Sequence, residues 1–444
     1  MNVLCVDFGS TFTKAVVVRS DPASVVAGGS VPTTSATDVM DGYHRLRRQL
    51  ADAGVEDPGR VLACSSAGGG LRLAVIGYEH AVTAAAGHRV GLSAGARVVH
   101  VGAGPMAPAD TAALRGSRPD IVLLVGGTDG GNADVLLHNA AVIARAALPA
   151  AVVVAGNSDA ADAVRDELAT AGCRVVVSPN VLPEIGVTAP EGARAAIREA
   201  FLRHVIGGKG LSREPAFATM VRAATPDAVL SGVEALAAHA GSDVLVVDVG
   251  GATTDVYSVL DPEGEDVRLA TDAVAPLWHA RTVEGDLGVR WNATGIVQAA
   301  SREGLLGKAE EPALLQSYAE RVESRPAHLP AGGAEQRLDQ TLSRLAAVVA
   351  VRRHARPSGP GQPPRPLQNV AHLVGSGGVL RHLTRQAGQD ALGAVTADVA
   401  GGWRLPFAAV RSVDTACVLF AAGLLSATDP DAAGRVARLA LQAP

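Results

Sequence analysis

The sequence predicts an α/β protein of two related lobes with an inserted parallel α/β subdomain. The chain has 444 residues, more than one hydrophobic core usually serves, so several domains are expected. An apolar strand, a Gly-rich turn and a β-branched strand follow one another near the N-terminus and again about halfway along. Between these two copies, strand and helix patterns alternate, which is typical of a parallel sheet with crossover helices.

The first lobe is expected over residues 1–95 and contains a hairpin, a surface helix and a further strand. An apolar run followed by a β-branched, alternating run is the pattern of paired strands. The expected positions are residues 2–6 and 13–19 for the hairpin, 41–53 for the helix, and 61–65 for the strand that leads into Gly68-Gly69-Gly70.

The inserted, doubly wound subdomain is expected over residues 96–185. Four β-branched runs alternate there with three helical stretches, and such a series forms a parallel sheet with right-handed crossovers. The runs lie at residues 97–101, 120–125, 150–155 and 174–178, and the helical stretches at 107–115, 133–146 and 159–171.

Connecting helices are expected over residues 186–240, with a long one at 190–205, and the second lobe is expected over residues 241–444. This lobe repeats the pattern of a buried strand before a Gly-rich turn. Its expected strands are at residues 243–247, 254–260 and 370–374.

The first candidate phosphate-binding turn is Asp7-Phe8-Gly9-Ser10-Thr11-Phe12-Thr13-Lys14. Asp7 stands at the end of the strand, and Gly9 lets the backbone pass close to a phosphate. The amides and hydroxyls of Ser10 and Thr11 can donate hydrogen bonds to phosphate oxygens. Lys14, one of three lysines in the chain, can neutralise phosphate charge. For this segment alone, an ordinary hairpin is the alternative.

The second candidate turn, Asp248-Val249-Gly250-Gly251-Ala252-Thr253-Thr254-Asp255, repeats this design. Gly250, Gly251 and Thr253 are the predicted phosphate contacts. Two copies of the same phosphate-binding motif are much less expected by chance than either copy alone. Asp7 and Asp248 would place two carboxylates near one ion, and Mg²⁺ prefers a few carboxylates together with water and phosphate oxygens.

A third Gly-rich segment, Val374-Gly375-Ser376-Gly377-Gly378-Val379-Leu380-Arg381, runs from a strand into a helix. Gly375, Ser376, Gly377 and Gly378 would let a flat adenine or ribose lie against the backbone. A plain strand-to-helix turn is the alternative.

In this order, the three segments resemble the phosphate-1, phosphate-2 and adenosine motifs of the actin, sugar-kinase and heat-shock-chaperone superfamily. The resemblance implies an actin-like ATPase fold with two ribonuclease-H-like lobes, and ATP and Mg²⁺ as cofactors. The segment from Thr225 to Ala240 resembles the connecting helix of that superfamily, with Thr225 as expected N-cap and Pro226 at the first helical position. Thr225 stands where the chaperones have a Glu that positions the attacking water, and Asp227 is the nearest carboxylate. Asp248 and Asp227 are therefore the candidate catalytic residues.

Over essentially the whole chain, the sequence resembles the glutamate-mutase accessory family often labelled MutL. The strings Gly-Gly-Thr-Asp-Gly-Gly-Asn at residues 126–132 and Glu-Gly-Asp-Leu-Gly at residues 284–288 are the most specific. This resemblance implies an ATPase that reactivates an adenosylcobalamin-dependent carbon-skeleton mutase or aminomutase, with the mutase subunits as partners.

Three acidic residues of these strings are further candidates. Glu284 follows the second turn and is a candidate contact for the ribose, whereas Asp286 is expected to form a turn. Asp129 follows a predicted parallel strand at the edge where ligands usually bind, so either a ligand contact or a role in the turn is expected. A further Gly-rich string, at residues 207–212, contains Lys209 but lacks the spacing of a P-loop.

Composition narrows the remaining classes of protein. A net charge of −5 argues against nucleic acid as the main partner. No run of eighteen or more uncharged apolar residues predicts a membrane span. The four cysteines show neither metal nor disulfide spacing, which suits a reducing cytoplasm. The first motif begins almost at the N-terminus, so no targeting segment is expected before it.

Two other functions stay open. A small-molecule kinase of the same superfamily would need a substrate pocket with a base beside the γ-phosphate. A filament-forming protein is the other alternative, and the inserted subdomain argues mildly against it because it would occupy packing surface. The sequence leaves the oligomeric state open.

Overall fold

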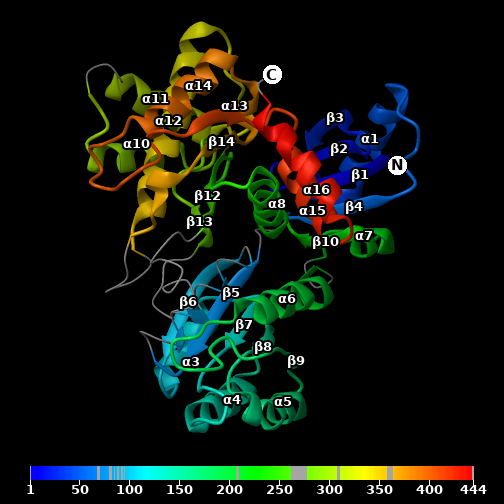
Figure 1. Cartoon of the computed structure of the whole chain (residues 1–444), viewed down its shortest axis with the longest axis vertical. Coiled ribbons are helices and arrows are strands. Elements are labelled where there is room, and N and C mark those ends of the chain that lie inside the picture. The colour runs from blue at the N-terminus through cyan, green and yellow to red at the C-terminus, as the bar shows by residue number, and fades with distance from the viewer. Residues whose placement is uncertain are drawn as a thin grey trace.

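The structure is a computed structural model of the chain (Figure 1). It describes residues 2–67, 71–79, 83–84, 86–87, 90–91, 94, 96–206, 210–261, 278–307, 311–357 and 364–442. The predicted Gly68-Gly69-Gly70 turn and Lys209 lie outside the described residues.

The first lobe is built on a five-stranded mixed sheet in the order β3-β2-β1-β4-β10. β2 pairs antiparallel with β1 and β3, whereas β4 runs parallel to both β1 and β10. The elements are β1 (Asn2–Phe8), β2 (Phe12–Ser20), β3 (Ala23–Pro32), α1 (Val39–Asp52), β4 (Val61–Ser65) and β10 (Val221–Ala224). The predicted hairpin, surface helix and strand of this lobe are confirmed.

The second lobe repeats the same sheet. Its order is β13-β12-β11-β14-β15, and the paired strands have the same directions as their counterparts in the first lobe. The strands are β11 (Val244–Val249), β12 (Thr254–Val259), β13 (His279–Glu284), β14 (His372–Ser376) and β15 (Val410–Val413). One strand order in two sheets confirms the predicted α/β fold, in which two ribonuclease-H-like lobes form an actin-like protein.

Helix α12 forms the centre of the core on the outer face of the second sheet. Its buried Leu342, Leu345 and Val349 belong to the same apolar cluster as Leu245 and Val247 of β11. The helices of this lobe are α10 (Ala293–Arg302), α11 (Pro312–Ser324), α12 (Gly333–Ala355), η6 (Leu367–Asn369), α13 (Gly378–His382) and α14 (Arg385–Thr396).

The two sheets share a second core, which is built around helices that lie between the lobes (Figure 1). Cys5 of β1 and Val246 of β11 belong to this one cluster, together with Leu230 of the connecting helix. These helices are α8 (Thr225–Ala240), α15 (Val418–Ser426), α16 (Pro430–Ala437) and η7 (Arg438–Leu441).

Two glycines let α8 and α15 cross with their backbones in contact. A Cβ atom on Gly232 would collide with the carbonyl oxygen of Leu419, and one on Gly423 with that of Ala228. The lobes are therefore joined at a backbone crossing that leaves no room for side chains.

The third sheet is wholly parallel, in the order β6-β5-β7-β8-β9. Its strands are β5 (Arg72–Gly77), β6 (Arg97–Ala103), β7 (Ile121–Leu124), β8 (Ala151–Val154) and β9 (Arg174–Val177). The four predicted runs are confirmed as β6 to β9. The central strand β5 was not predicted, and it lies upstream of the expected start of the insertion at residue 96. A six-residue apolar run does not by itself reveal which sheet it joins.

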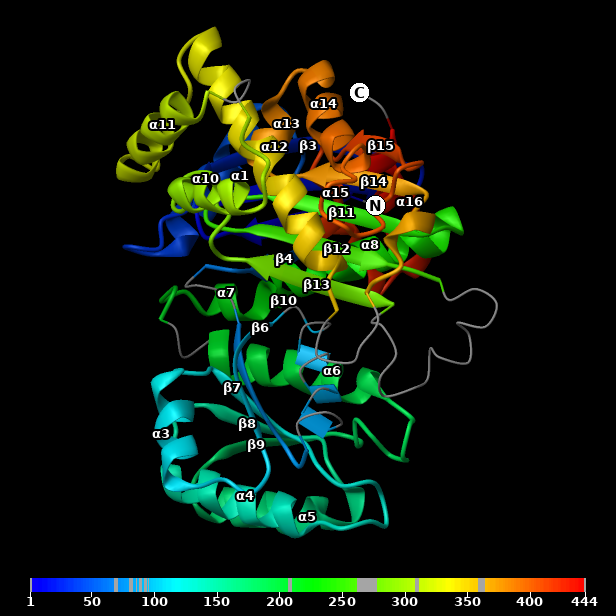
Figure 2. The ribbon, with the colours of Figure 1, turned by 90° about the vertical axis from the view of Figure 1, so that its left-hand side faces the viewer.

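Helices cover both faces of the third sheet. α3 (Pro108–Gly116), α4 (Asp134–Ala146) and α5 (Ala161–Thr170) pack on one face. On the other face lies α6 (Pro190–Ala200), between the third sheet and the two lobes (Figure 2). The expected helix over residues 190–205 continues from α6 as a π-helical segment, η3 (Phe201–Ile206), before the short α7 (Pro215–Met220). Among the described helices, none combines the length and apolar character that a bilayer crossing needs.

Candidate functional site

The first Asp-Gly turn closes the hairpin between β1 and β2. The amide of Gly9 donates to the carbonyl of Phe12 at 3.2 Å, and a Cβ atom on Gly9 would lie 2.5 Å from that same oxygen. Glycine is therefore required at this position. Ser10 is exposed and Thr11 half-buried at the tip of the turn, where both are accessible to a ligand.

Asp7 is the buried centre of the first turn. It stands opposite Lys14 across the hairpin, and its Oδ2 lies 3.6 Å from Lys14 Nζ. Its Oδ1 accepts a hydrogen bond of 2.6 Å from Thr225 Oγ1, and Cys64 Sγ donates to it at 3.7 Å. These contacts hold the carboxylate between the first sheet and the start of α8.

The prediction that Thr225 caps α8 is wrong. Thr225 is the first residue of the helix and Ala224 occupies the cap position, with no side-chain cap hydrogen bond. The hydroxyl of Thr225 donates to Asp7 and is thus aimed away from the helix amides. Pro226 is therefore the second helical residue and not, as expected, the first, but it still lies in the first turn, where its missing N–H costs nothing.

The second Asp-Gly turn has the same geometry. The amide of Gly250 donates to the carbonyl of Thr253 at 2.9 Å, and a Cβ atom on Gly250 would lie 2.8 Å from that oxygen. Arg290 N donates to the carbonyl of Gly251 at 2.9 Å, which anchors this turn from outside. Thr253 is half-buried beside it.

All three motifs meet in the structure. A Cβ atom built on Gly251 would lie 3.7 Å from Thr11 Oγ1, so the tips of the two Asp-Gly turns face each other. A Cβ atom on Gly377 would lie 2.7 Å from Asp248 Oδ1, and the φ angle of Gly377 is 98°, which only glycine adopts readily. Ser376 pairs with Asp248 across the parallel strands.

The other two glycines of the third segment differ in their surroundings. A Cβ atom on Gly375 would meet the side chains of Leu380 and Leu392, so this position faces the core. Gly378 is exposed and has open space around it. The backbone around Gly378 is thus the part of the segment that is free to receive a flat ligand.

The centre of the site is the buried carboxyl group of Asp248, which is influenced by two other carboxylates. Burial raises the pKa of Asp248 to about 6, and the carboxylates of Asp255 and Asp7 add to this effect, although Lys14 and Arg381 oppose it. Asp248 therefore loses its proton at a higher pH than an ordinary carboxyl group, and a cation beside it would favour the charged form.

Lys14 is the matching cation. Burial alone would lower its pKa, but Asp7, Cys417 and Asp248 together raise it. The ammonium therefore stays charged at neutral pH, as phosphate binding requires.

Two residues of the site were not predicted, namely Arg381 and Cys417. Arg381 Nη1 donates to Cys417 Sγ. Arg381 lowers the pKa of Asp248 and of Lys14, whereas Cys417 raises the pKa of Lys14. Burial raises the pKa of Cys417 to about 11, so its thiol is protonated at neutral pH and is no nucleophile. Arg381 ends the third motif, and its charge at that position was the available signal.

A third missed residue, Asp255, occupies in the second turn the position that Lys14 has in the first. It stands opposite Asp248 across the hairpin, as Lys14 stands opposite Asp7. Its Oδ2 accepts a hydrogen bond of 2.9 Å from Arg281 Nη2. Its Oδ1 is buried and has no hydrogen-bond partner among the described residues.

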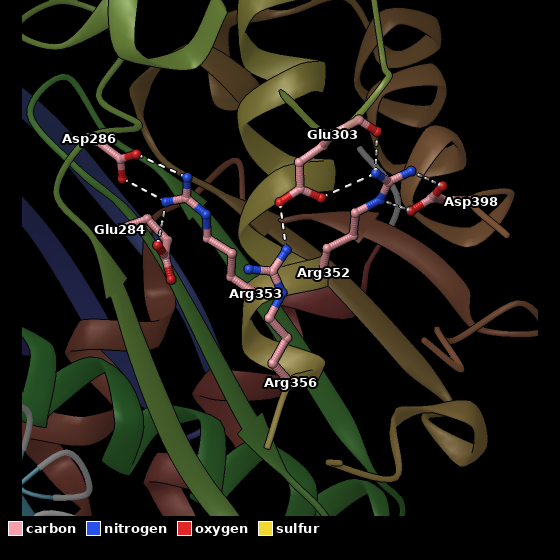
Figure 3. Close-up of polar contacts among 7 residues, drawn as sticks. All are labelled: Glu284, Asp286, Glu303, Arg352, Arg353, Arg356 and Asp398. Atoms are coloured by element: carbon pink, nitrogen blue, oxygen red, sulfur yellow. Dashed lines mark hydrogen bonds and ion pairs between the residues drawn. The ribbon is translucent and has the colours of Figure 1, made fainter. Parts of the chain in front are cut away.

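Glu284 ends β13 and is held by an arginine of α12 (Figure 3). Arg353 Nη1 lies 2.7 Å from Glu284 Oε2 and 2.7 Å from Asp286 Oδ1. Burial raises the pKa of Glu284, although Arg353 opposes the effect. The contact of Glu284 with a ribose stays a prediction, and Asp286 has an ion-pair partner in addition to its place in a turn.

The neighbouring Arg352 points to a different set of carboxylates (Figure 3). Its guanidinium is buried and donates two hydrogen bonds of 2.6 Å to Asp398, with a third contact of 3.2 Å to Glu303. Arg356, which is much more exposed, also contacts Glu303, at 2.7 Å. Together with Arg353, these residues tie α12 to the end of β13 and to the segments that follow α10 and α14.

Asp227 lies on the side of α8 that faces away from Asp7. Its buried carboxylate accepts a hydrogen bond of 2.6 Å from Arg198 Nε of α6. Thr225 and Asp227 are two residues apart, and such residues point to nearly opposite sides of a helix. A role for Asp227 in activating water stays a prediction.

Asp129 is engaged in holding loops of the third sheet together. Its Oδ1 accepts hydrogen bonds from the amide of Ser158 at 2.9 Å and from Asn180 Nδ2 at 2.8 Å. Burial alone would raise the pKa of Asp129, but these hydrogen bonds lower it. Of the two roles expected for Asp129, these contacts favour the structural one.

Comparison with known proteins places the chain in a family. The profile described as "MutL protein" matches residues 3–441. The chain belongs to the MutL protein family. Protein MutL of Clostridium tetanomorphum is 34% identical over 457 aligned positions, which cover 98% of this chain and 97% of that relative.

Solved structures outside the MutL family have a loosely similar arrangement. A glycerol dehydratase reactivase is 12% identical with a TM-score of 0.37, over 96% of this chain and 99% of that one. A nucleotide-free acetone carboxylase is 16% identical with a TM-score of 0.40, over 96% of this chain and 70% of that one.

We predict that Arg352→Met destabilises the second lobe by about 3–5 kcal/mol, because it leaves the buried carboxylate of Asp398 without its cation, whereas Glu303 keeps Arg356. Arg356→Met should cost less than about 1 kcal/mol, because the guanidinium of Arg356 is half-exposed and Glu303 keeps its contact with Arg352. All three tryptophans lie in this lobe, so denaturant unfolding followed by tryptophan fluorescence measures both variants. Equal losses of stability in the two variants would contradict the prediction that Arg352 contributes more to stability than Arg356.

We predict a pH-dependent difference in stability between wild type and Asp248→Asn. Because folding raises the pKa of Asp248 to about 6, its contribution is fully present below pH about 4 and is lost as pH rises through about 6. The Asn variant should therefore gain stability relative to wild type across this interval. Thermal unfolding at several pH values measures the difference in stability between the two proteins. A difference that does not depend on pH would refute the raised pKa of Asp248.

Proposed function

We propose that this protein binds and hydrolyses Mg-ATP between its two lobes, and that it uses this cycle to reactivate an adenosylcobalamin-dependent mutase. The observation that carries the first part is the close approach of Gly251 to Thr11, which sets the two Asp-Gly turns face to face. Membership of the MutL family supports the second part, since glutamate mutase is the partner implied by the family resemblance.

The phosphates would lie between the two turns. In the first turn the amide of Gly9 is bonded to its own hairpin, so the exposed Ser10 and half-buried Thr11 are the donors that remain for a ligand. Thr253 and the backbone of Gly251 are their counterparts on the facing turn. Lys14 supplies positive charge beside the first turn, where it would offset the charge of a triphosphate.

The nucleoside would lie against the third motif. Gly377 keeps the backbone close to Asp248, and the exposed Gly378 leaves a flat surface for an adenine or ribose. Glu284, from the end of β13, is the proposed ribose contact. Arg353 would then act through Glu284 by fixing the position of its carboxylate.

Asp7 and Asp248 fit a magnesium ion held largely by water and phosphate oxygens. The described residues contain no group of three His, Cys, Asp or Glu side chains that could enclose a metal. Magnesium does not need such a group, because it commonly keeps several waters and takes one or two carboxylates. Burial, together with the carboxylates of Asp255 and Asp7, raises the pKa of Asp248, and a cation bound beside it would favour the charged form. When bound, Mg²⁺ would neutralise charge on the phosphates, and Asp248 would orient water beside them.

Reactivation would require the two nucleotide states to differ in their affinity for the mutase. A ligand shifts a conformational equilibrium only by its different affinity for the two states. The helices shared by both lobes, α8 and α15, would carry the change, because the core between the lobes contains residues from both sheets. In one state the protein would grip the mutase, and in the other it would release it.

We predict that Asp7→Ala and Asp248→Ala each weaken Mg-ATP binding by about 1–3 kcal/mol, the cost of losing one charge-assisted contact. Asp57→Ala is the matched control, because Asp57 is an exposed carboxylate paired with Arg47 on the surface. Isothermal titration calorimetry on folded proteins measures the affinities. Unchanged affinity in both site variants would show that the nucleotide binds elsewhere.

We predict that a cognate mutase inactivated with damaged cobalamin recovers when this protein, fresh adenosylcobalamin and Mg-ATP are added. Recovery should be absent with a non-hydrolysable ATP analogue or with Asp248→Ala, because one nucleotide state alone cannot complete a cycle of grip and release. Mutase activity is the readout. Equal recovery without ATP would exclude the reactivating role and would favour the kinase alternative.

A further inference from the structure

Helix α6, which packs on the third sheet, is joined to α8 by two arginine–carboxylate pairs. Arg198 Nε donates to Asp227 Oδ2 at 2.6 Å. One turn earlier on α6, Arg194 Nη1 donates to Glu234 Oε1 at 3.0 Å. Glu234 also contacts His279 Nδ1 of β13 at 3.2 Å. The two pairs belong to the same interface but engage different turns of α8.

Only the first of these pairs involves a fully buried carboxylate. The side chain of Asp227 is 4% exposed, whereas that of Glu234 is 24% exposed. Arg198 is itself 37% exposed, but its partner Asp227 is buried, so removing the guanidinium leaves a buried carboxylate without its opposite charge, which is destabilising. Loss of Arg198 should therefore displace the first turn of α8, whereas loss of Arg194 leaves a carboxylate that water can reach.

The first turn of α8 is held from both sides. On one side Thr225 donates to Asp7 at 2.6 Å, and on the other Arg198 donates to Asp227 at the same distance. Pro226 stands between them, and its fixed φ angle makes this dipeptide stiff. A displacement of Asp227 is therefore passed to Thr225 and alters its hydrogen bond to Asp7.

We infer that Arg198 is a positioning residue of the nucleotide site, through which the third-sheet subdomain holds Thr225 on the Asp7 carboxylate. The inference rests on the proposed function in one respect, namely that Asp7 serves Mg-ATP. It adds that the subdomain carrying α6 contributes to a site that lies between the other two lobes. The raised pKa of Arg198, which its hydrogen bond to Asp227 causes foremost, is consistent with a tight pair.

The first arm of the test needs no nucleotide. Hydrogen–deuterium exchange is measured on the full chain for wild type, Arg198→Met, Arg198→Lys and Arg194→Met. Arg198→Met should speed exchange in peptides covering residues 221–230, and Arg198→Lys should restore most of the protection because lysine keeps a charged donor. Arg194→Met should affect peptides around Glu234 instead. Unchanged exchange over 221–230 in Arg198→Met would overturn the inference.

The second arm measures affinity for Mg-ATP and for adenosine by calorimetry. Arg198→Met should weaken Mg-ATP roughly three- to tenfold, the equivalent of one ordinary hydrogen bond, and leave adenosine unchanged because adenosine does not reach Asp7. Arg198→Lys should recover most of the loss. Thr225→Val should weaken Mg-ATP as well, and adding Arg198→Met to it should cause little further loss, because both changes break one linkage.

The outcomes separate the inference from the proposed function. Equal effects of Arg194→Met and Arg198→Met, or fully additive losses with Thr225→Val, would show a general interface effect and would overturn the inference. If wild-type protein binds no Mg-ATP, the proposed function fails, and the exchange arm still decides whether Arg198 holds the first turn of α8. If Arg198→Met does not fold, Arg198→Gln takes its place in both arms, and Arg198→Lys remains the variant that restores the contact.

Discussion

The site depends on the burial of Asp248, whose carboxylate is withdrawn from water and faces further negative charge from Asp255 and from Asp7 of the other lobe. Asp7 and Asp248 are each the next-to-last residue of the central strand of their sheet, and each is partly or wholly withdrawn from water. Lys14 and Arg381 offset some of this charge, yet the pKa of Asp248 remains raised to about 6. A cation beside Asp248 would favour its charged form.

The shared helices fix where those carboxylates meet. α8 begins at Thr225, against Asp7, and crosses α15 at Gly232 and Gly423, where backbone touches backbone. α15 begins just after Asp414, whose carboxylate accepts hydrogen bonds from two amides of its first turn, at 3.0 and 3.2 Å. Both helices thus start near the site and meet again in the core between the lobes. The close backbone crossing packs α8 and α15 as one unit between the lobes.

The features that could be predicted from the sequence are those that local chain geometry determines. Turns such as that of Gly9 are specified within a few residues, so the three Gly-rich motifs and most strands could be found. Contacts between residues that lie far apart in the sequence could not be found in this way. Thr225 was expected to cap its own helix, but its acceptor is Asp7, 218 positions away. The pair of Arg198 with Asp227 and the membership of β5 in the third sheet likewise depend on how whole subdomains pack, which no periodicity encodes.

The two Asp-Gly turns are copies that differ in the sign of one charge. At the same place in the hairpin, Lys14 stands opposite Asp7, whereas Asp255 stands opposite Asp248. Two identical turns facing each other would receive a ligand equally well in either of two orientations related by a twofold axis. With a cation on one side and an anion on the other, the two orientations are unequal in energy. The lysine in one turn and the aspartate at the equivalent position of the other therefore make the two orientations of a ligand between the turns unequal.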